Sequence, residues 1–275
     1  MTDSNSLRKD TVALEIEGVK LRIEVMRRDG RRAPLVFLHG FGSTKEDYAD
    51  LAGQPQFDGR PIVAFDAPGC GESHSDDLSA LSIPFLRQTA EGVLRHYEIE
   101  VCHLIGHSMG GLTALMLAGE SPHQVLSFTD IEGNLAPEDC FLSRQAFDHP
   151  ADDPEAFMDA FAERAWHSPT LSHPLFAAAV RQKVRPEAVG PILRSMVDCS
   201  ENGRLMARFT GLPCPRMFVY GEQNRTLSYL GTLLRQGVQL AEIERAGHWP
   251  MYANPQALWT RLGQFVEQSE MAAAA

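Results

Sequence analysis

The sequence predicts an α/β protein with a mostly parallel central sheet, helices on both faces and a helical insertion in its second half. Three observations support this prediction. Continuously apolar runs at residues 34–38, 61–65 and 101–105 are typical of central strands buried on both faces. Patterns of helical length separate these runs, and strands that alternate with helices favour a parallel sheet. Residues 136–208 contain no convincing buried strand and carry apolar residues at helical spacing.

The first half of the chain begins with an edge hairpin and continues into the central strands. Residues 12–17 and 19–26 alternate apolar and polar side chains, and Gly18 between them indicates an antiparallel hairpin. Helices are expected over residues 45–52 and 83–97. Glycine-rich turns follow the central strands, and ligands of such sheets bind beyond the carboxyl ends of the strands. We therefore expect the functional site at that edge.

The second half contains the insertion and the return to alternation. A strand is expected over residues 125–131, and the helices of the insertion over 154–166, 174–183 and 187–200. Strands 216–220 and 238–243 and helices 227–236 and 255–268 follow, with a frayed tail at 271–275. The apolar content of the insertion is too high for disorder. We therefore predict a core, residues 1–134 and 209–275, and a helical cap, residues 135–208, packed over the sheet edge.

The composition of the chain limits the kinds of binding partner and the cellular compartment that we expect for this protein. The chain has 275 residues, is 44% hydrophobic and has a net charge of -11, which argues against nucleic acid as its partner. No apolar run is long enough to predict a membrane span. The polar residues 1–6 lack the apolar core of a signal peptide. Five scattered cysteines indicate free thiols in a reducing compartment, so we expect a cytoplasmic protein.

A candidate nucleophile lies where the apolar run 101–105 meets the next predicted helix. Gly106-His107-Ser108-Met109-Gly110 contains a Gly-x-Ser-x-Gly pattern between a predicted strand and a predicted helix. A serine at such a turn adopts a strained backbone conformation that lifts its hydroxyl above the sheet. The alternative is a chance pattern in a loop of small residues. The flanking strand and helix favour a nucleophile.

Four motifs together resemble those of the α/β-hydrolase superfamily. They are His39-Gly40-Phe41-Gly42, the turn Asp66-x-Pro-Gly-x-Gly-x-Ser73, the stretch Gly106 to Gly111, and Gly247-His248-Trp249-Pro250. The resemblance covers most of the chain outside the insertion, and helical caps at this position are common in the family. It implies that the four motifs are the oxyanion loop, a structural turn, the nucleophile elbow and the catalytic-histidine turn.

The roles of the site residues follow from this arrangement. Ser108 needs a base, and we expect His248 to deprotonate it, because histidine suits that role near neutral pH. The backbone amides of Phe41 and Met109 are expected to form the oxyanion hole. We expect His39 and His107 to support the loops through backbone hydrogen bonds. His103 and His107 are not expected to bind a metal, because the strand end should place them on opposite sides of a turn.

The acid of the site departs from the commonest family pattern. That pattern has an aspartate where this chain has Asn224, three residues after Gly221. The acid could stand at the end of strand 125–131, as Glu132 or Asp130, which share one face by the period-two rule. Alternatively Glu222 could reach the histidine, or the site could be impaired. We favour Glu132, because it emerges at the carboxyl end of the strand.

The favoured hypothesis is a serine hydrolase that cleaves a small ester or thioester without a cofactor or metal. Alternatives are a carbon–carbon bond hydrolase or an acyltransferase on the same residues, and a non-catalytic protein that binds a small molecule. Serine at the elbow excludes haloalkane dehalogenase and epoxide hydrolase chemistry, for which relatives of this fold need an aspartate. Large side chains of the insertion could line an apolar pocket or form ordinary cap core: Phe157, Phe161, Trp166, Phe176 and Met196.

Overall fold

The structure is a computed structural model that describes residues 6–148, 153–169 and 172–274. Residues 1–5 and Ala275 lie outside the described residues. The prediction that the polar residues 1–6 are not a signal peptide therefore falls mostly outside the described part of the chain. No helix among the described residues is long and apolar enough to cross a membrane.

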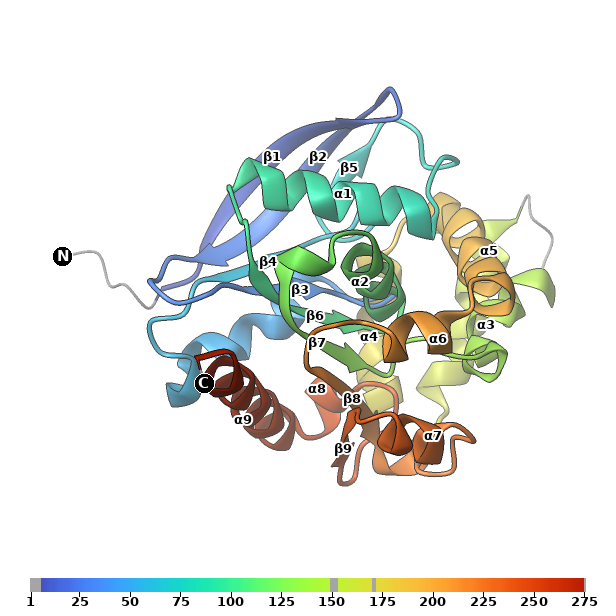
Figure 1. The fold of residues 1–275 in the computed structure, drawn as a ribbon. Coiled ribbons are helices and arrows are strands. Elements are labelled where there is room, and N and C mark those ends of the chain that lie inside the picture. Colours follow the sequence, from blue (N-terminus) through green and yellow to red (C-terminus); the bar gives the residue numbers. More distant parts are fainter. Residues whose placement is uncertain (1–5, 149–152, 170–171, 275) are drawn as a thin grey trace.

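A single sheet forms the centre of the described part of the chain (Figure 1). Its nine strands are β1 (Arg8–Ile16), β2 (Val19–Arg28), β3 (Leu35–Leu38), β4 (Ile62–Phe65), β5 (His74–Ser75), β6 (Cys102–His107), β7 (Val125–Ile131), β8 (Arg216–Gly221) and β9 (Gln239–Ile243). Their order is β1-β2-β4-β3-β6-β7-β8-β9, with β5 paired to β2. β2 is antiparallel to β1 and β4, whereas every pairing from β4 to β9 is parallel. The predicted edge hairpin and mostly parallel sheet are confirmed.

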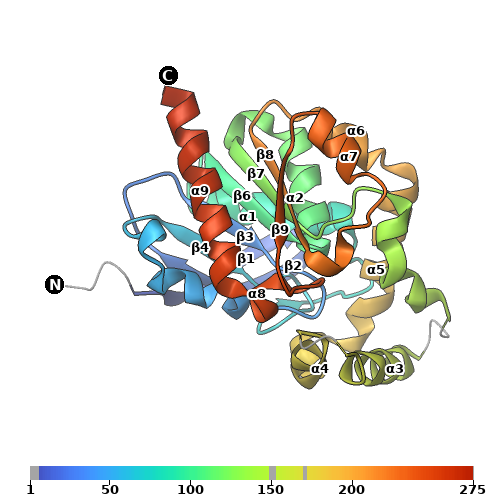
Figure 2. The same cartoon turned by 90° about the horizontal axis from the view of Figure 1, so that it is seen from below.

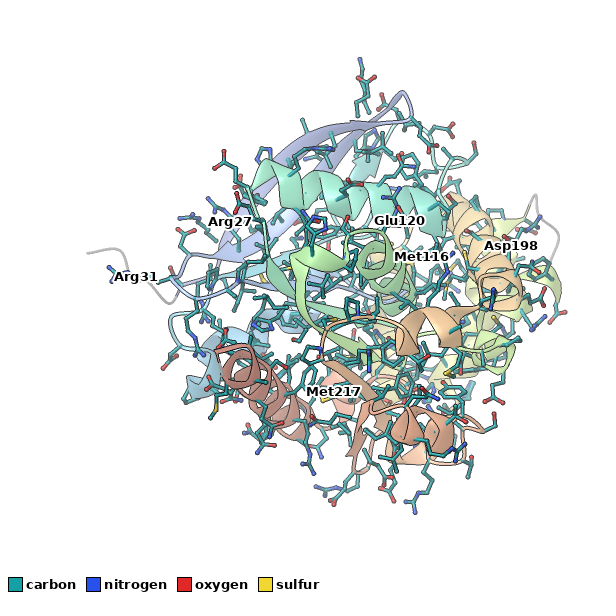
Figure 3. The ribbon with its side chains drawn as sticks, in the orientation of Figure 1. Arg27, Arg31, Met116, Glu120, Asp198 and Met217 are labelled. Carbon is teal, nitrogen blue, oxygen red and sulfur yellow. The ribbon has the colours of Figure 1, made fainter. Side chains whose placement is uncertain are left out.

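The middle of the sheet is buried on both faces, as the apolar runs predicted. Every residue of β3, β4 and β6 is buried. Figure 3 shows Met217 of β8 among the interior side chains, and it is fully buried, whereas Arg27, Arg31 and Asp198 lie toward the periphery. Burial alternates toward the edges of the sheet, in β1, in the first half of β2 and in β9.

Helices cover both faces of the sheet. The α-helices are α1 (Ile83–His96), α2 (Met109–Glu120), α3 (Pro154–Trp166), α4 (Ser172–Lys183), α5 (Pro186–Asn202), α6 (Leu205–Thr210), α7 (Leu230–Arg235), α8 (Pro250–Ala253) and α9 (Pro255–Ala274). The 3-10 helices are η1 (Lys45–Gly53), η2 (Pro55–Phe57), η3 (Pro122–Gln124), η4 (Pro137–Phe141), η5 (Ser143–Asp148) and η6 (Glu222–Asn224). α1 and α2 lie on one face and α9 on the other (Figures 1 and 2).

Several helices differ from the predicted ranges. η1 is a 3-10 helix, and α6 and α8 were not predicted. α7 begins three residues late, and Glu138 accepts hydrogen bonds from the backbone and hydroxyl of Ser228 in the turn before it. The prediction of a frayed tail was wrong. α9 continues to Ala274, because Glu270 near its end pairs with the buried Arg60.

The helical insertion lies beyond the carboxyl ends of the strands, above the start of α2. α3 and α4 run side by side there, and α5 returns the chain to the core (Figure 2). Phe161 of α3 packs against Phe41, and Phe176 of α4 stacks on Trp249 at 4.3 Å between ring centroids. Backbone pairing between Cys70 and Val184 joins the insertion to the turn after β4. These contacts place the insertion directly over the turns that carry the chemistry.

A buried ion pair fixes the loops beside the site. Lys45 Nζ lies 2.7 Å from Asp66 Oδ2, and both side chains are fully buried. Asp66 also accepts hydrogen bonds from the backbone N–H groups of Lys45 and Glu72. The first motif residue after β4 therefore holds the start of η1 and the glycine-rich turn together.

Replacing Lys45 with methionine should lower the free energy of unfolding by about 3 kcal/mol or more, because Asp66 would remain as a buried charge that has lost this partner. Urea denaturation measures the change. Lys20→Met, at an exposed position of β2, provides the control and should change stability by about 0.5 kcal/mol at most. A loss of similar size in both variants would show that the buried pair is not what stabilises the loops.

Candidate active site

Ser108 occupies the sharp turn between β6 and α2. Its φ of 51° and ψ of -117° lie in a region that costs non-glycine residues energy. A side chain at Gly106 would place its Cβ 2.4 Å from the Gly110 carbonyl oxygen, and one at Gly110 would meet Leu38 O at 2.1 Å. Only glycine fits at these two positions, so the strand can turn at once into the helix. The predicted strained turn is confirmed.

His248 lies directly against Ser108, although 140 residues separate them. His248 Nε2 is 3.1 Å from Ser108 Oγ, and each residue is only 7% exposed. The imidazole packs against the rings of Phe141 and Trp249. A neutral Nε2 can accept the serine hydroxyl proton in this arrangement. The geometry is that of a nucleophile beside its base.

Glu132 approaches the other nitrogen of the same imidazole. It follows β7 directly and has a φ of 52°. Its Oε2 lies 3.6 Å from His248 Nδ1, longer than a hydrogen bond. Among the described residues it is the one carboxylate within 4.0 Å of the His248 ring nitrogens. Such contacts are often long in unliganded sites and shorten when substrate binds.

Two further groups hold the Glu132 carboxylate in place. The Gly221 backbone N–H donates to Oε1 at 2.6 Å, and Asn224 Nδ2 donates to Oε2 at 2.7 Å. Asn224 thus stands where the commonest family pattern has the acid and binds the carboxylate that approaches from β7. Sequence reasoning missed this partnership. The amide of Asn224, which can donate a hydrogen bond to a carboxylate, is the signal in the sequence that could have indicated it.

The other two candidate acids do not reach the histidine. Asp130 is fully buried beneath the elbow, where a Cβ at Gly111 would come 2.2 Å from its Oδ1. Burial raises the pKa of Asp130 well above its usual range, which favours the neutral acid. Glu222 instead accepts a hydrogen bond from the Arg245 backbone and pairs with Arg225 on the surface.

The two expected oxyanion donors belong to the first turn of α2 and to the loop after β3. Met109 is the first residue of α2, so its amide is one of the N–H groups that have no partner within the helix. Phe41 belongs to the loop after β3 and lines the same cavity as Ser108. A Cβ at Gly40 would lie 2.5 Å from His107 Nδ1, so glycine allows this loop to approach the elbow closely.

His39 and His107 support the loops, as expected. His39 Nδ1 lies 2.8 Å from the Gly40 carbonyl, to which it donates, and Nε2 accepts from the Ala67 N–H at 2.9 Å. His107 Nε2 donates to the His248 carbonyl oxygen at 2.8 Å. Burial lowers the pKa of both imidazoles, which keeps them neutral. The His107 bond joins the elbow to the histidine turn.

The expected geometry of His103 and His107 was wrong. β6 continues through His107, so the two side chains point to the same face of the strand. They lie about 13 Å apart along it, by the usual rise per residue. His103 contacts Ser127 and Glu270 instead. No group of metal-binding side chains occurs among the described residues.

A cavity of about 20 Å³ lies above Ser108, with room for about one water molecule. Its described lining is Phe41, Ser108, Asn134, Asp139, Phe141, Leu142, Ser143, Phe161, Leu193, Met196, His248 and Trp249. Of the five large insertion residues, Phe161 and Met196 reach this lining, while Phe157 and Phe176 are buried beside Phe161. Trp166, at the end of α3, is 54% exposed and belongs to neither group.

The comparisons with known proteins agree with the fold. The model of the Alpha/beta hydrolase family matches residues 35–261. The chain is 32% identical over 113 residues to the dihydrolipoyllysine-residue acetyltransferase component of the acetoin cleaving system of Cupriavidus necator, a match that covers 41% of this chain and only 29% of that protein. It is 26% identical over 243 residues to the 2-succinyl-6-hydroxy-2,4-cyclohexadiene-1-carboxylate synthase of an Enterobacter species, covering 84% of this chain and 91% of the relative.

A solved structure of a thermophilic esterase from Thermogutta terrifontis superposes with a TM-score of 0.77 at 18% identity, covering 95% of this chain and 99% of the esterase. At that identity the likeness shows a common fold. The family match extends over most of the chain, and the chain belongs to the alpha/beta hydrolase family. The chain spans less than half the length of several curated relatives that it matches.

Proposed function

We propose that this member of the alpha/beta hydrolase family is a hydrolase that cleaves a small carboxylic ester or thioester through an acyl-enzyme on Ser108. His248 acts as the general base and acid, and Glu132 orients its imidazole and stabilises the imidazolium. The amides of Phe41 and Met109 bind the oxyanion. Ser108 Oγ at 3.1 Å from His248 Nε2, on a strained turn, is the observation that carries the proposal.

The first half-reaction forms the acyl-enzyme. Ser108 Oγ attacks the carbonyl carbon while its proton passes to His248 Nε2. The carbonyl oxygen becomes negative between the amides of Phe41 and Met109, close to the start of α2, where the helix dipole also favours an anion. The carbon–oxygen or carbon–sulfur bond then breaks, and His248 returns the proton to the leaving alcohol or thiol.

The second half-reaction releases the acid. Water attacks the acyl carbon and gives its proton to His248, the bond to Ser108 Oγ breaks, and Oγ recovers the proton. Each imidazolium state places a positive charge beside Glu132, where attraction can close the 3.6 Å gap. The sequence of steps requires no cofactor or metal.

Residues 135–208 act in this proposal as a cap that closes over the acyl group. The cavity in this structure is far too small for even a butyryl group. Phe141 is half exposed and contacts His248, so its movement, together with that of the cap helices, would open a path to Ser108. We also propose a cytoplasmic location, with which the five unpaired thiols are compatible.

The names of two relatives support the proposal that this chain acts on an acyl group. They include an acetyltransferase component, and the sn-1-specific diacylglycerol lipase ABHD11 of Mus musculus, which is 34% identical over 113 residues. Both names describe reactions at an acyl group. They agree with the proposed chemistry without specifying the substrate of this chain.

A fluorophosphonate should label the protein at one equivalent, and peptide mapping should locate the label on Ser108. Activation by His248 makes this serine more reactive than the others, so His248→Ala should slow labelling by about 100-fold or more. Intact-protein mass spectrometry measures both rates. A protein that stays unlabelled, or that is labelled equally fast without His248, would instead fit a non-catalytic binding role.

A further inference from the structure

The described walls of the cavity above Ser108 carry few charged side chains. Most of its described lining is apolar or aromatic, and none of it is lysine or arginine. The segments outside the described residues, 1–5, 149–152, 170–171 and 275, contain no lysine or arginine in their sequence either. A substrate anion that entered the cavity would therefore lose its hydration without meeting a lysine or arginine, which is costly.

One carboxylate, Asp139, belongs to the lining. Its Oδ2 accepts hydrogen bonds from the backbone N–H groups of Leu135 and Ala136 at 2.7 and 2.8 Å, and its Oδ1 accepts from Tyr229 Oη at 2.9 Å. These donors are neutral, and Asp139 forms no ion pair among the described residues. Its negative charge is thus held firmly and is not neutralised by a cation.

The ionisation of Asp139 fits this description. Burial raises the pKa of Asp139 to about 6, against the three hydrogen bonds, which lower it. The side chain is consequently charged at pH 8. An acyl group with its own carboxylate would meet a like charge in a small cavity of low polarity.

We propose that the acyl site selects uncharged acyl groups and that Asp139 is the residue that rejects anionic ones. This inference rests on the proposed function, since it concerns the acyl group that Ser108 would carry. Asp139 acts on specificity through its charge and takes no part in bond making or breaking.

Two esters that differ in one charge test the proposal: p-nitrophenyl methyl adipate, which is neutral, and p-nitrophenyl hydrogen adipate, which is anionic. At pH 8, kcat/KM for the neutral ester should exceed that for the anionic ester by about tenfold or more, although the neutral ester is larger. The uncatalysed rate of each ester is subtracted. This comparison uses the unmodified protein and does not depend on the folding of a variant.

Asp139→Asn should reduce the ratio between the two esters severalfold, because the charge is removed while the size is kept. The amide oxygen can still accept from Leu135 and Ala136, and its nitrogen can donate to Tyr229. Glu138→Gln is the matched control, since it removes one charge from the adjacent residue, which binds Ser228 at the surface. It should leave the ratio unchanged. Thermal melting verifies that both variants are folded.

Equal kcat/KM values for the two esters in the unmodified protein would overturn the inference while leaving Ser108 chemistry intact. Equal shifts of the ratio in the two variants would also overturn it, because net charge would then be the cause. Failure of the proposed function appears differently: neither ester is hydrolysed, or hydrolysis persists in Ser108→Ala.

Discussion

Ser108→Ala should lower kcat/KM for p-nitrophenyl butyrate by about 10⁴-fold or more, because no other group can form the acyl-enzyme. The lost hydroxyl lies 3.1 Å from His248 Nε2, and alanine removes one oxygen atom from a buried turn. Alanine also fits the strained φ no worse than serine does. We therefore expect the variant to fold and to retain only the weak catalysis that the oxyanion donors supply. Release of p-nitrophenol measures the rate.

Ser121→Ala is the matched control for this experiment. Ser121 terminates the same helix, α2, at the end remote from the site. The same change of side chain should leave kcat/KM within about twofold. Substantial activity in purified Ser108→Ala, above that of a mock purification, would show that the elbow serine is not the nucleophile.

Glu132→Gln should lower kcat by about 10²- to 10⁴-fold, the second largest effect that we expect. A neutral amide can hold the imidazole but cannot stabilise the imidazolium, and in a protease triad the corresponding loss reaches about 10⁴-fold. Glu222→Gln is the control, because Glu222 is the neighbouring carboxylate and faces the Arg245 backbone and Arg225. It should be nearly as active as the unmodified protein. A larger loss of kcat in Glu222→Gln than in Glu132→Gln would show that Glu222, and not Glu132, is the acid of the site.

The double variant Glu132→Gln/Asn224→Asp should have a kcat at least about tenfold higher than that of Glu132→Gln alone. The second change returns a carboxylate to the commonest family position, where Asn224 now donates to Glu132 at 2.7 Å. Asn224→Asp alone should not help, since it places two like charges side by side and raises the pKa of one of them. If the double variant is no more active than Glu132→Gln, the two strand ends are not interchangeable sources of the acid.

Much of the fold could be predicted because its signals are local. The apolar runs of β3, β4 and β6 and the alternation of β1 and β2 each specify a strand within a few residues. β7 and α3 match their predicted bounds, residues 125–131 and 154–166. Predictions failed where a distant contact decides the outcome, as at the end of α9, where Glu270 pairs with Arg60.

The site residues also divide into those that local signals predict and those whose role depends on distant contacts. Ser108 could be predicted because the strain of its turn demands glycines at fixed spacing on both sides, and His248 because its turn follows the last strand. For the acid of the site, the sequence alone left several candidate residues. Asp130 and Glu132 share one face of β7, but Asp130 lies beneath the elbow and Glu132 beyond the strand end.

The sequence by itself determined the α/β architecture, the elbow serine and the order of the motifs, since each depends on neighbours within a few positions. Only the tertiary structure decided which carboxylate faces His248, that Asn224 holds it, and that the cavity above Ser108 is small and has no lysine or arginine in its described lining. Those features arise where segments that are distant in the sequence converge at one edge of the sheet. Their geometry depends on the packing of the whole chain, and no local pattern encodes it.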